Sequence, residues 1–203
     1  MYEKYGQFID GKWHKSSTGE TYEVINPANE EIIGKASKAS PEDVDKALLS
    51  AQKGLEVWKK TPPWQRAYIL RRIADKMREK QDILAKWMTL EVGKPFAEAK
   101  GEVNGAADIY EWNAEETKRI YGQTVESRFE DTRVHVYYQP VGVVAALVPW
   151  NFPLVLSARK ISTALAAGCS VIVKPDVITP GVVMEQVEIC RECGVPPGVV
   201  NLL

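Results

Sequence analysis

One region of the sequence constrains the fold more than any other. Residues 141–153 read VGVVAALVPWNFP, and residues 168–175 read GCSVIVKP. The first segment is a near-continuous apolar run followed by a tight turn with one polar amide, and the second is an apolar strand that ends in a lysine. A helix is predicted between them, beginning after Pro153 and ending at Gly168. This order is typical of the first unit of a nucleotide-binding α/β sheet, whose ligands lie at the carboxyl ends of the strands.

The remaining residues extend this block to βαβαβ. Strands are predicted at 141–148, 170–173 and 199–203, and uninterrupted apolar runs are typical of parallel strands covered on both faces. The expected fold class is therefore α/β, with an open, mainly parallel sheet and flanking helices. Three parts are expected: a β arm and helical part at 1–121, a β ribbon at 122–139 and the βαβαβ block at 140–203.

Turns and caps organise the region before residue 121. The dipeptide Asp10-Gly11 separates two short apolar runs, and a second strand pair brackets residues 26–29. At residues 40–43, serine, proline and two acids predict a helix start. Gly93, with Pro95 just after it, predicts a helix end. Apolar residues at helical spacing fill the region between, and four tryptophans are expected to anchor the packing between helices: Trp58, Trp64, Trp87 and Trp112.

The ribbon is predicted from two short polar strands. Residues 125–129 and 133–139 flank the polar turn at 130–132, and the second strand alternates apolar and polar side chains. A two-stranded ribbon is only marginally stable by itself. We therefore expect it to pair with another chain or another part of the same assembly.

Composition excludes several classes of function. The 203 residues have a formal net charge of -1 with acids and bases interspersed, so nucleic acid is not an expected partner. No apolar run approaches the roughly 18 residues that a membrane span needs, and the first seven residues lack the apolar core of a signal peptide. The expected location is the cytoplasm. The 3 cysteines do not suggest a disulfide framework.

Two polar residues follow predicted strands and carry the candidate chemistry. Asn151, in a turn pinned by Pro149 and Pro153, is placed to donate a hydrogen bond to negative charge developing on a substrate oxygen. The same asparagine also suits an Asx turn that caps the next helix. Lys174 is placed to reach ribose hydroxyls or phosphate, and an ordinary solvated lysine is the alternative. The G-x-G-x-x-G fingerprint of common dinucleotide sites does not follow the first strand.

The cysteines offer no nucleophile or metal site. Cys169 begins a predicted buried strand, where a thiol is usually inert. Cys190 and Cys193 have C-x-x-C spacing, but without a second ligand pair they do not predict zinc binding. A redox role needs the amino terminus of a helix, whereas this pair falls near a predicted carboxyl end before Gly194. No metal is expected.

Seven short sequence motifs resemble those in the amino-terminal part of the NAD(P)-dependent aldehyde dehydrogenase superfamily, and they occur in the same order as in that family. The resemblance spans essentially the whole chain and is closest in style to succinate-semialdehyde dehydrogenase-like members. The motifs are INPA at 25–28, EVGKP at 91–95, QPVGVV at 139–144, PWNFP at 149–153, ALAAGC at 164–169, KP at 174–175 with TP at 179–180, and PPGVVN at 196–201.

The resemblance implies roles for particular residues. Asn151 resembles the family asparagine that donates to the oxyanion of the thiohemiacetal formed by a cysteine thiolate and the aldehyde. Lys174 resembles the lysine that binds the adenosine ribose. Lys160 matches a lysine assigned to a proton relay, and a helix lysine paired with a carboxylate is the other interpretation. The ribbon resembles the family's oligomerisation arm, which implies a homodimer or homotetramer. The residues expected to line the cofactor cleft are Val148, Pro149, Trp150 and Asn151.

One departure concerns the cofactor. Many NAD-preferring members carry a glutamate three residues after the cofactor lysine, where it bonds the ribose 2'-hydroxyl and would repel a 2'-phosphate. This chain has Val177 there, so both NAD and NADP are admissible. The neighbouring Asp176 is a candidate for the missing contact.

A second departure concerns the extent of the chain. The family's nucleophilic cysteine, general-base glutamate and pyrophosphate loop lie beyond the equivalent of Leu203, so we expect an incomplete chain that is inactive alone. Two interpretations follow. In the first, it is part of an enzyme that oxidises an aldehyde, such as a semialdehyde, to a carboxylic acid with hydride transfer to NAD(P). In the second, it is a non-catalytic binding or assembly fragment whose sheet exposes an apolar edge at 199–203.

Overall fold

A computed structural model describes residues 2–203 and centres on one mixed sheet. Five strands follow the order β2-β1-β9-β8-β7. Strands β7, β8 and β9 are parallel to one another, whereas β1 is antiparallel to β2 and to β9. The predicted α/β class is confirmed, and the amino-terminal hairpin makes the sheet mixed. The strands are β1 (Gln7–Ile9), β2 (Lys12–His14), β7 (Val143–Leu147), β8 (Ser170–Lys174) and β9 (Val200–Leu202).

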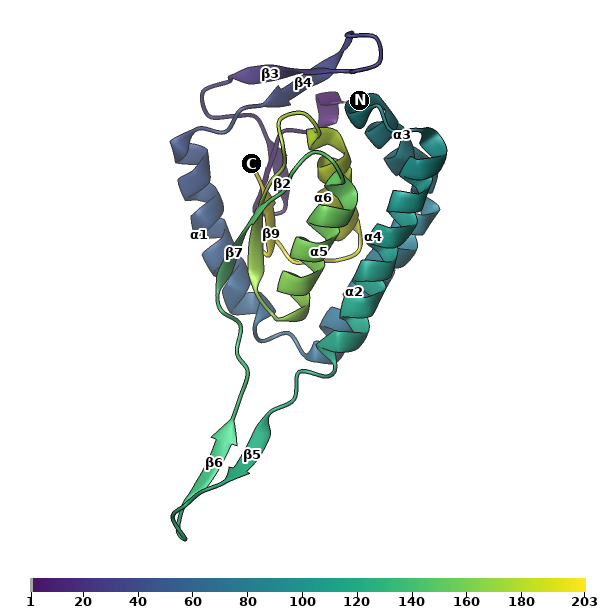
Figure 1. Cartoon of the computed structure of the whole chain (residues 1–203). Coiled ribbons are helices and arrows are strands. Elements are labelled where there is room, and N and C mark those ends of the chain that lie inside the picture. Colours follow the sequence, from purple (N-terminus) through teal and green to yellow (C-terminus); the bar gives the residue numbers. More distant parts are fainter. Residues whose placement is uncertain (1) are drawn as a thin grey trace.

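Helices cover both faces of this sheet. Figure 1 shows α1 on one side, and α5 and α6 on the other. Helices α2, α3 and α4 pack outside α5 and α6 and form a further layer. Among the helices of residues 2–203, none is both long and apolar enough to cross a membrane. The helices are α1 (Pro41–Trp58), α2 (Pro63–Glu79), α3 (Gln81–Val92), α4 (Phe96–Thr117), α5 (Pro153–Ala166) and α6 (Pro180–Glu192), with a 3-10 turn η1 at Tyr2–Lys4.

Two hairpins lie outside the main sheet. The β3–β4 hairpin lies across one end of the molecule, and the β5–β6 ribbon projects from the opposite end (Figure 1). The predicted ribbon forms, but Val125 pairs with Val134, whereas the predicted turn at 130–132 would have set it opposite Tyr137; all the strand residues are exposed. The strands are shorter than the sequence predicts. Their bounds are β3 (Thr21–Ile25), β4 (Ile32–Ser37), β5 (Gln123–Glu126) and β6 (Arg133–Val136).

The predicted caps and turns form with the expected geometry. Ser40 caps α1 in a reciprocal capping box with Asp43. Gly93 ends α3 in the left-handed conformation, at φ 75°. Asp10 and Gly11 have φ values of 52° and 77°, as a two-residue hairpin turn of type I′ requires. Local residue chemistry therefore sets these boundaries.

The tryptophan prediction is confirmed for two positions and wrong for two. Trp58 and Trp87 are buried, and the Trp58 indole N–H donates to the Leu165 carbonyl at 2.9 Å. Trp64 and Trp112 are 74% and 70% exposed. The helical phase explains the difference, because the buried face of α4 passes through positions 110 and 114 and leaves position 112 on the outside.

The predicted burial of the first parallel strand is also wrong for this chain. β7 is the edge of the sheet, and Leu147 is 66% exposed. The predicted free edge at 199–203 is wrong as well, because β9 lies between β1 and β8. The β1–β2 hairpin covers that edge, from a part of the chain about 190 residues away in sequence.

A buried carboxylate from α3 holds the start of α6. The Thr179 N-cap of α6 makes no side-chain cap, and Pro180 lacks an N–H. Glu91 instead accepts the next two helix N–H groups, from Gly181 at 2.6 Å and Val182 at 3.1 Å, and it also accepts the Tyr2 hydroxyl. Burial raises the pKa of Glu91 to about 7, and these three donors act in the opposite direction.

Backbone meets backbone where α1 packs on the loop before β9. A Cβ at Gly54 would lie 2.2 Å from the Gly198 carbonyl carbon, whereas a Cβ at Gly101 in α4 would meet nothing within 4 Å. The two helical glycines therefore differ in the space that a methyl group would have.

We predict opposite effects for alanine at the two positions. Gly54→Ala should lower the free energy of unfolding by roughly 1–3 kcal/mol, because α1 must move off the loop. Gly101→Ala should raise it by up to about 1 kcal/mol through helix propensity. Denaturant unfolding of both variants checks this. Equal effects of the same sign would contradict the contact described for Gly54.

Candidate functional site

The turn between β7 and α5 places Asn151 beside a helix start that has no local cap. Phe152 occupies the N-cap position with φ −138° and ψ 64°, and it makes no side-chain cap. Asn151 is exposed, and within residues 2–203 its side-chain amide makes no hydrogen bond. The alternative prediction of an Asx cap on α5 is therefore wrong. The amide is left available to an external acceptor.

Glu102 on α4 caps α5 from across the helix interface. Its Oε1 accepts the N–H groups of Leu154 at 3.0 Å and Val155 at 3.2 Å. Pro153, at the first helical position, has no N–H to satisfy. The Glu102 side chain is 2% exposed, so the helix start rests on a buried carboxylate.

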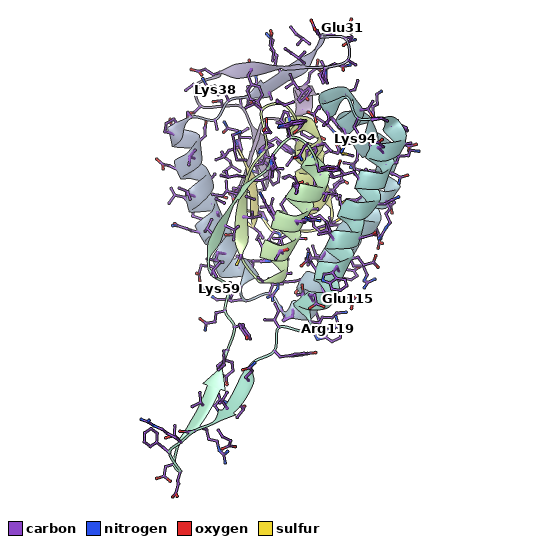
Figure 2. The ribbon with its side chains drawn as sticks, in the orientation of Figure 1. Glu31, Lys38, Lys59, Lys94, Glu115 and Arg119 are labelled. Atoms are coloured by element: carbon purple, nitrogen blue, oxygen red, sulfur yellow. The ribbon has the colours of Figure 1, made fainter. Side chains whose placement is uncertain are left out.

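Lys94 pairs with that carboxylate and also contacts the turn. The Lys94 ammonium forms an ion pair with Glu102, and the lysine side chain is 9% exposed. It donates to the Asn151 carbonyl at 3.3 Å and lies 3.9 Å from the centroid of the Phe152 ring. Figure 2 shows Lys94 at the end of the molecule that carries Glu31 and Lys38, opposite Lys59 and Glu115.

A cavity of about 470 Å³ opens at this turn. Asn151 and Phe152 line one side, and residues of α4 and α5 line the rest. Arg159 brings a guanidinium to this cavity, and no ion pair to it is found among residues 2–203. The full lining is Lys94, Glu98, Gly101, Glu102, Gly105, Asn151, Phe152, Val155, Leu156 and Arg159.

Lys160 does not reach that cavity in the described chain. Its ammonium donates to the Leu147 carbonyl at the end of β7 and does not pair with a carboxylate of residues 2–203. The alternative of a carboxylate-paired helix lysine is therefore not observed. Its part in a proton relay stays a prediction.

A second cavity, of about 420 Å³, lies at the carboxyl ends of β7 and β8. It brings together most of the predicted cofactor residues, whereas Trp150 and Asn151 do not line it. Lys174 and Val177 also border a larger cavity of about 760 Å³ under the β3–β4 hairpin. The lining of the smaller cavity is Leu147, Val148, Pro149, Lys174, Pro175, Asp176 and Val177.

The charges in this cavity suit a polyhydroxylated or phosphorylated ligand. The Lys174 ammonium donates to the Pro175 carbonyl at 2.6 Å. Partial burial lowers the pKa of Lys174, and the Asp176 carboxylate raises it. One Asp176 oxygen already accepts the Ile178 N–H at 3.0 Å, in a local turn. Val177 is 53% exposed and brings no charge.

The three thiols are placed as buried apolar groups. Cys169, Cys190 and Cys193 are 2%, 1% and 3% exposed. Burial raises the pKa of Cys190 to about 12 and also raises that of Cys193, whereas a nucleophilic thiol needs a lowered pKa. Within residues 2–203, no group of three or more His, Cys, Asp and Glu side chains is arranged to hold a metal ion.

Three residues that line the Asn151 cavity, Lys94, Glu102 and Arg159, were not predicted from the sequence. Arg159 could have been found from its helical spacing. Positions 152, 155 and 159 share one face of a helix, so Arg159 is expected on the same side as Phe152. Lys94 belongs to the motif EVGKP and Glu102 follows it, but their contacts with the turn span 52 to 57 residues of sequence. That pairing depends on how α4 packs against α5, which periodicity does not specify.

Comparison with known proteins places this geometry in a family. Residues 13–203 match the sequence model of the aldehyde dehydrogenase family. The chain is 44% identical over 196 residues to glutarate-semialdehyde dehydrogenase of Pseudomonas aeruginosa, covering 97% of this chain and 41% of that protein. It is 44% identical over 195 residues to the NADP(+) succinate-semialdehyde dehydrogenase GabD of Escherichia coli, covering 96% and 40%.

Solved structures agree over the same span. The crystal structure of an Escherichia coli NADP-dependent enzyme superposes with a TM-score of 0.96 at 43% identity, covering 98% of this chain and 41% of that one. Betaine aldehyde dehydrogenase from Staphylococcus aureus, in complex with NAD+, gives 0.96 at 35% identity, with the same coverage. The chain thus spans about 40% of the length of the relatives it matches. On this evidence, the chain belongs to the aldehyde dehydrogenase family.

Proposed function

We propose that this chain forms part of an enzyme that oxidises an aldehyde to a carboxylic acid with NAD or NADP. The observation that carries the proposal is the Asn151 side chain, which lines a cavity at the end of β7 and makes no hydrogen bond within residues 2–203. The Lys174 cavity lies at the end of the same strand. Substrate and cofactor sites at one edge of a parallel sheet suit a reaction between the two ligands.

Asn151 would act by stabilising charge. When a thiolate attacks the aldehyde carbonyl, negative charge develops on the oxygen, and a positioned amide N–H lowers the energy of that state. The buried thiols of this chain do not suit the attack, so the nucleophile is assigned to a part of the enzyme outside these residues. Loss of a hydride from the thiolate–aldehyde adduct to the bound cofactor would leave a thioester, from which water releases the acid.

The cofactor site is assigned to the cavity around Lys174. The partly buried ammonium suits ribose hydroxyls or phosphate, and Val148 and Pro149 offer apolar walls, so the residues present fit a nicotinamide dinucleotide. The bound cofactor supplies the acceptor for the hydride that leaves the substrate. A neutral Val177 neither attracts a 2'-hydroxyl nor repels a 2'-phosphate, which supports acceptance of both NAD and NADP.

The substrate class we propose is a short aldehyde that bears a carboxylate at its far end. Arg159 lines the Asn151 cavity without an ion pair from residues 2–203 and suits a carboxylate. Two similar proteins are named glutarate-semialdehyde and succinate-semialdehyde dehydrogenases. A semialdehyde would then place its aldehyde near Asn151 and its acid near Arg159.

The β5–β6 ribbon is assigned to oligomer formation. Its strand residues are exposed, and they include Val125, Val134 and Val136. A two-stranded ribbon that projects from the body and exposes three valines gains stability by adding to another sheet, which supports a homodimer or homotetramer. We also propose a cytoplasmic location. One similar protein, from Arabidopsis thaliana, is named as mitochondrial, so similarity alone does not assign the compartment.

The proposal predicts aldehyde-dependent NAD(P)H formation and a preference for acidic substrates. The purified protein is weighed as the intact chain and assayed with succinate semialdehyde and with butanal, a neutral four-carbon aldehyde. We expect higher kcat/KM for the semialdehyde, and Arg159→Ala should reduce that preference about tenfold or more, because a charged hydrogen bond is lost.

Two outcomes would count against this assignment. Equal preference in the parent and in Arg159→Ala would remove Arg159 from the substrate site. A mass of 22.7 kDa with no activity would favour the non-catalytic fragment.

Asn151→Ala should slow the chemical step. Loss of one oxyanion donor raises the barrier by about 2–4 kcal/mol, while cofactor affinity stays nearly unchanged. Rapid-mixing measurement of NAD(P)H formation isolates this step, and a cofactor titration supplies the control. An unchanged rate in the chemical step would exclude the assigned role.

Lys174→Ala should weaken cofactor binding and leave the chemical step of the bound complex largely intact. We expect the dissociation constant to rise about tenfold or more, since a charged hydrogen bond is lost. Fluorescence titration with NAD and with NADP measures both constants. A larger loss for NADP would indicate contact with the 2'-phosphate, and unchanged constants for both would move the cofactor away from this cavity.

A further inference from the structure

The Lys94–Glu102 pair contacts the Asn151 carbonyl, the Phe152 ring and the first N–H groups of α5. Lys94 donates to the Asn151 carbonyl at 3.3 Å and lies 3.9 Å from the centroid of the Phe152 ring. Glu102 accepts the N–H groups of Leu154 and Val155, the first that α5 has to offer. The backbone from the Asn151 carbonyl to the first N–H groups of α5 is therefore held by one buried ion pair.

This arrangement takes the place of a local side-chain cap at the start of α5. The Phe152 N-cap makes no side-chain bond, and Pro153 contributes no N–H. The contacts that remain come from α4 and from the loop before it, 52 to 57 residues away in sequence. Without them, the buried Leu154 N–H, the part-buried Val155 N–H and the Asn151 carbonyl would lose these partners.

Burial and charge make the pair suitable for this task. The Lys94 and Glu102 side chains are 9% and 2% exposed, so water screens their attraction weakly. The carboxylate faces the positive end of the α5 dipole, and the ammonium balances its charge. Removing either partner leaves a buried charge without its counter-charge, which favours rearrangement of the turn.

We propose that Lys94 and Glu102 are positioning residues that set the orientation of the Asn151 amide. The inference rests on the proposed function of Asn151. Neither residue needs to touch the substrate, because Lys94 binds the Asn151 main chain and leaves the side-chain amide available. Displacement of a donor by about 1 Å can slow a reaction by about a hundredfold, so small movements of the turn would be visible in the rate.

Lys100, on the same helix as Glu102, provides a matched control for Lys94. Its ammonium forms an ion pair with Asp82 at 2.6 Å and lies 5.0 Å from the centroid of the Phe96 ring, which repeats the chemistry of Lys94. The pair is exposed, at 37% and 73%, and Lys100 does not line the Asn151 cavity. Lys100→Met therefore removes a lysine, an ion pair and a ring contact without reaching the turn.

The test is a double-mutant cycle between Lys94→Met and Asn151→Ala in the complete enzyme. We expect Lys94→Met to slow NAD(P)H formation in the chemical step by roughly 10- to 100-fold, with cofactor affinity unchanged. In the Asn151→Ala background the same change should have less than about a twofold effect, since no amide remains to be positioned. Lys100→Met should have almost no effect in either background.

Equal fold reductions in both backgrounds would overturn the inference and assign Lys94 to general stability. An unchanged rate in Asn151→Ala itself would instead overturn the proposed function, so the two failures are distinguishable.

Two further variants keep the test decisive if Lys94→Met does not fold. Lys94→Arg keeps the charge and should retain most of the rate. Glu102→Gln keeps an oxygen for the Leu154 and Val155 N–H groups but leaves the buried Lys94 charge without its counter-charge, and it should slow the reaction. Full activity in Glu102→Gln would contradict the role of the ion pair.

Discussion

The architecture depends on two buried carboxylates that cross between helix layers. Glu91 on α3 holds the start of α6, and Glu102 on α4 holds the start of α5. Both helices begin with proline and have no cap of their own. The same solution therefore occurs twice, with the outer helices supplying acceptors to the inner ones. These contacts fix the helix layers against the sheet whose strand ends carry both candidate cavities.

Much of the fold could be predicted because its signals are local. The capping box at Ser40, the left-handed Gly93 and the Asp10-Gly11 turn all depend on neighbouring residues, and each forms as expected. The helical phase was harder to specify. Trp64 and Trp112 lie on exposed faces because residue type alone does not determine which side of a helix meets the core.

The site could be predicted only in part, and the reason is again the range of the contacts. Lys174 ends β8 and Asn151 lies in the turn after β7, so their place at the carboxyl ends of the strands follows from the order of elements. Lys94 and Glu102 meet the Asn151 turn only because α4 packs on α5. The edge position of β7 could not be predicted from the sequence either. It depends on the amino-terminal hairpin pairing with β9, which leaves β7 at the opposite edge of the sheet.

The β5–β6 ribbon can unfold locally without unfolding of the helices and the main sheet. It projects from the body, and its strand residues are exposed, so it shares little of the packing that stabilises the helices and the sheet (Figure 1). Its backbone amides can exchange with solvent through local opening, while the core stays closed. In an isolated chain, protection of these amides from exchange would then report on assembly, whereas protection in β8 would report on global unfolding.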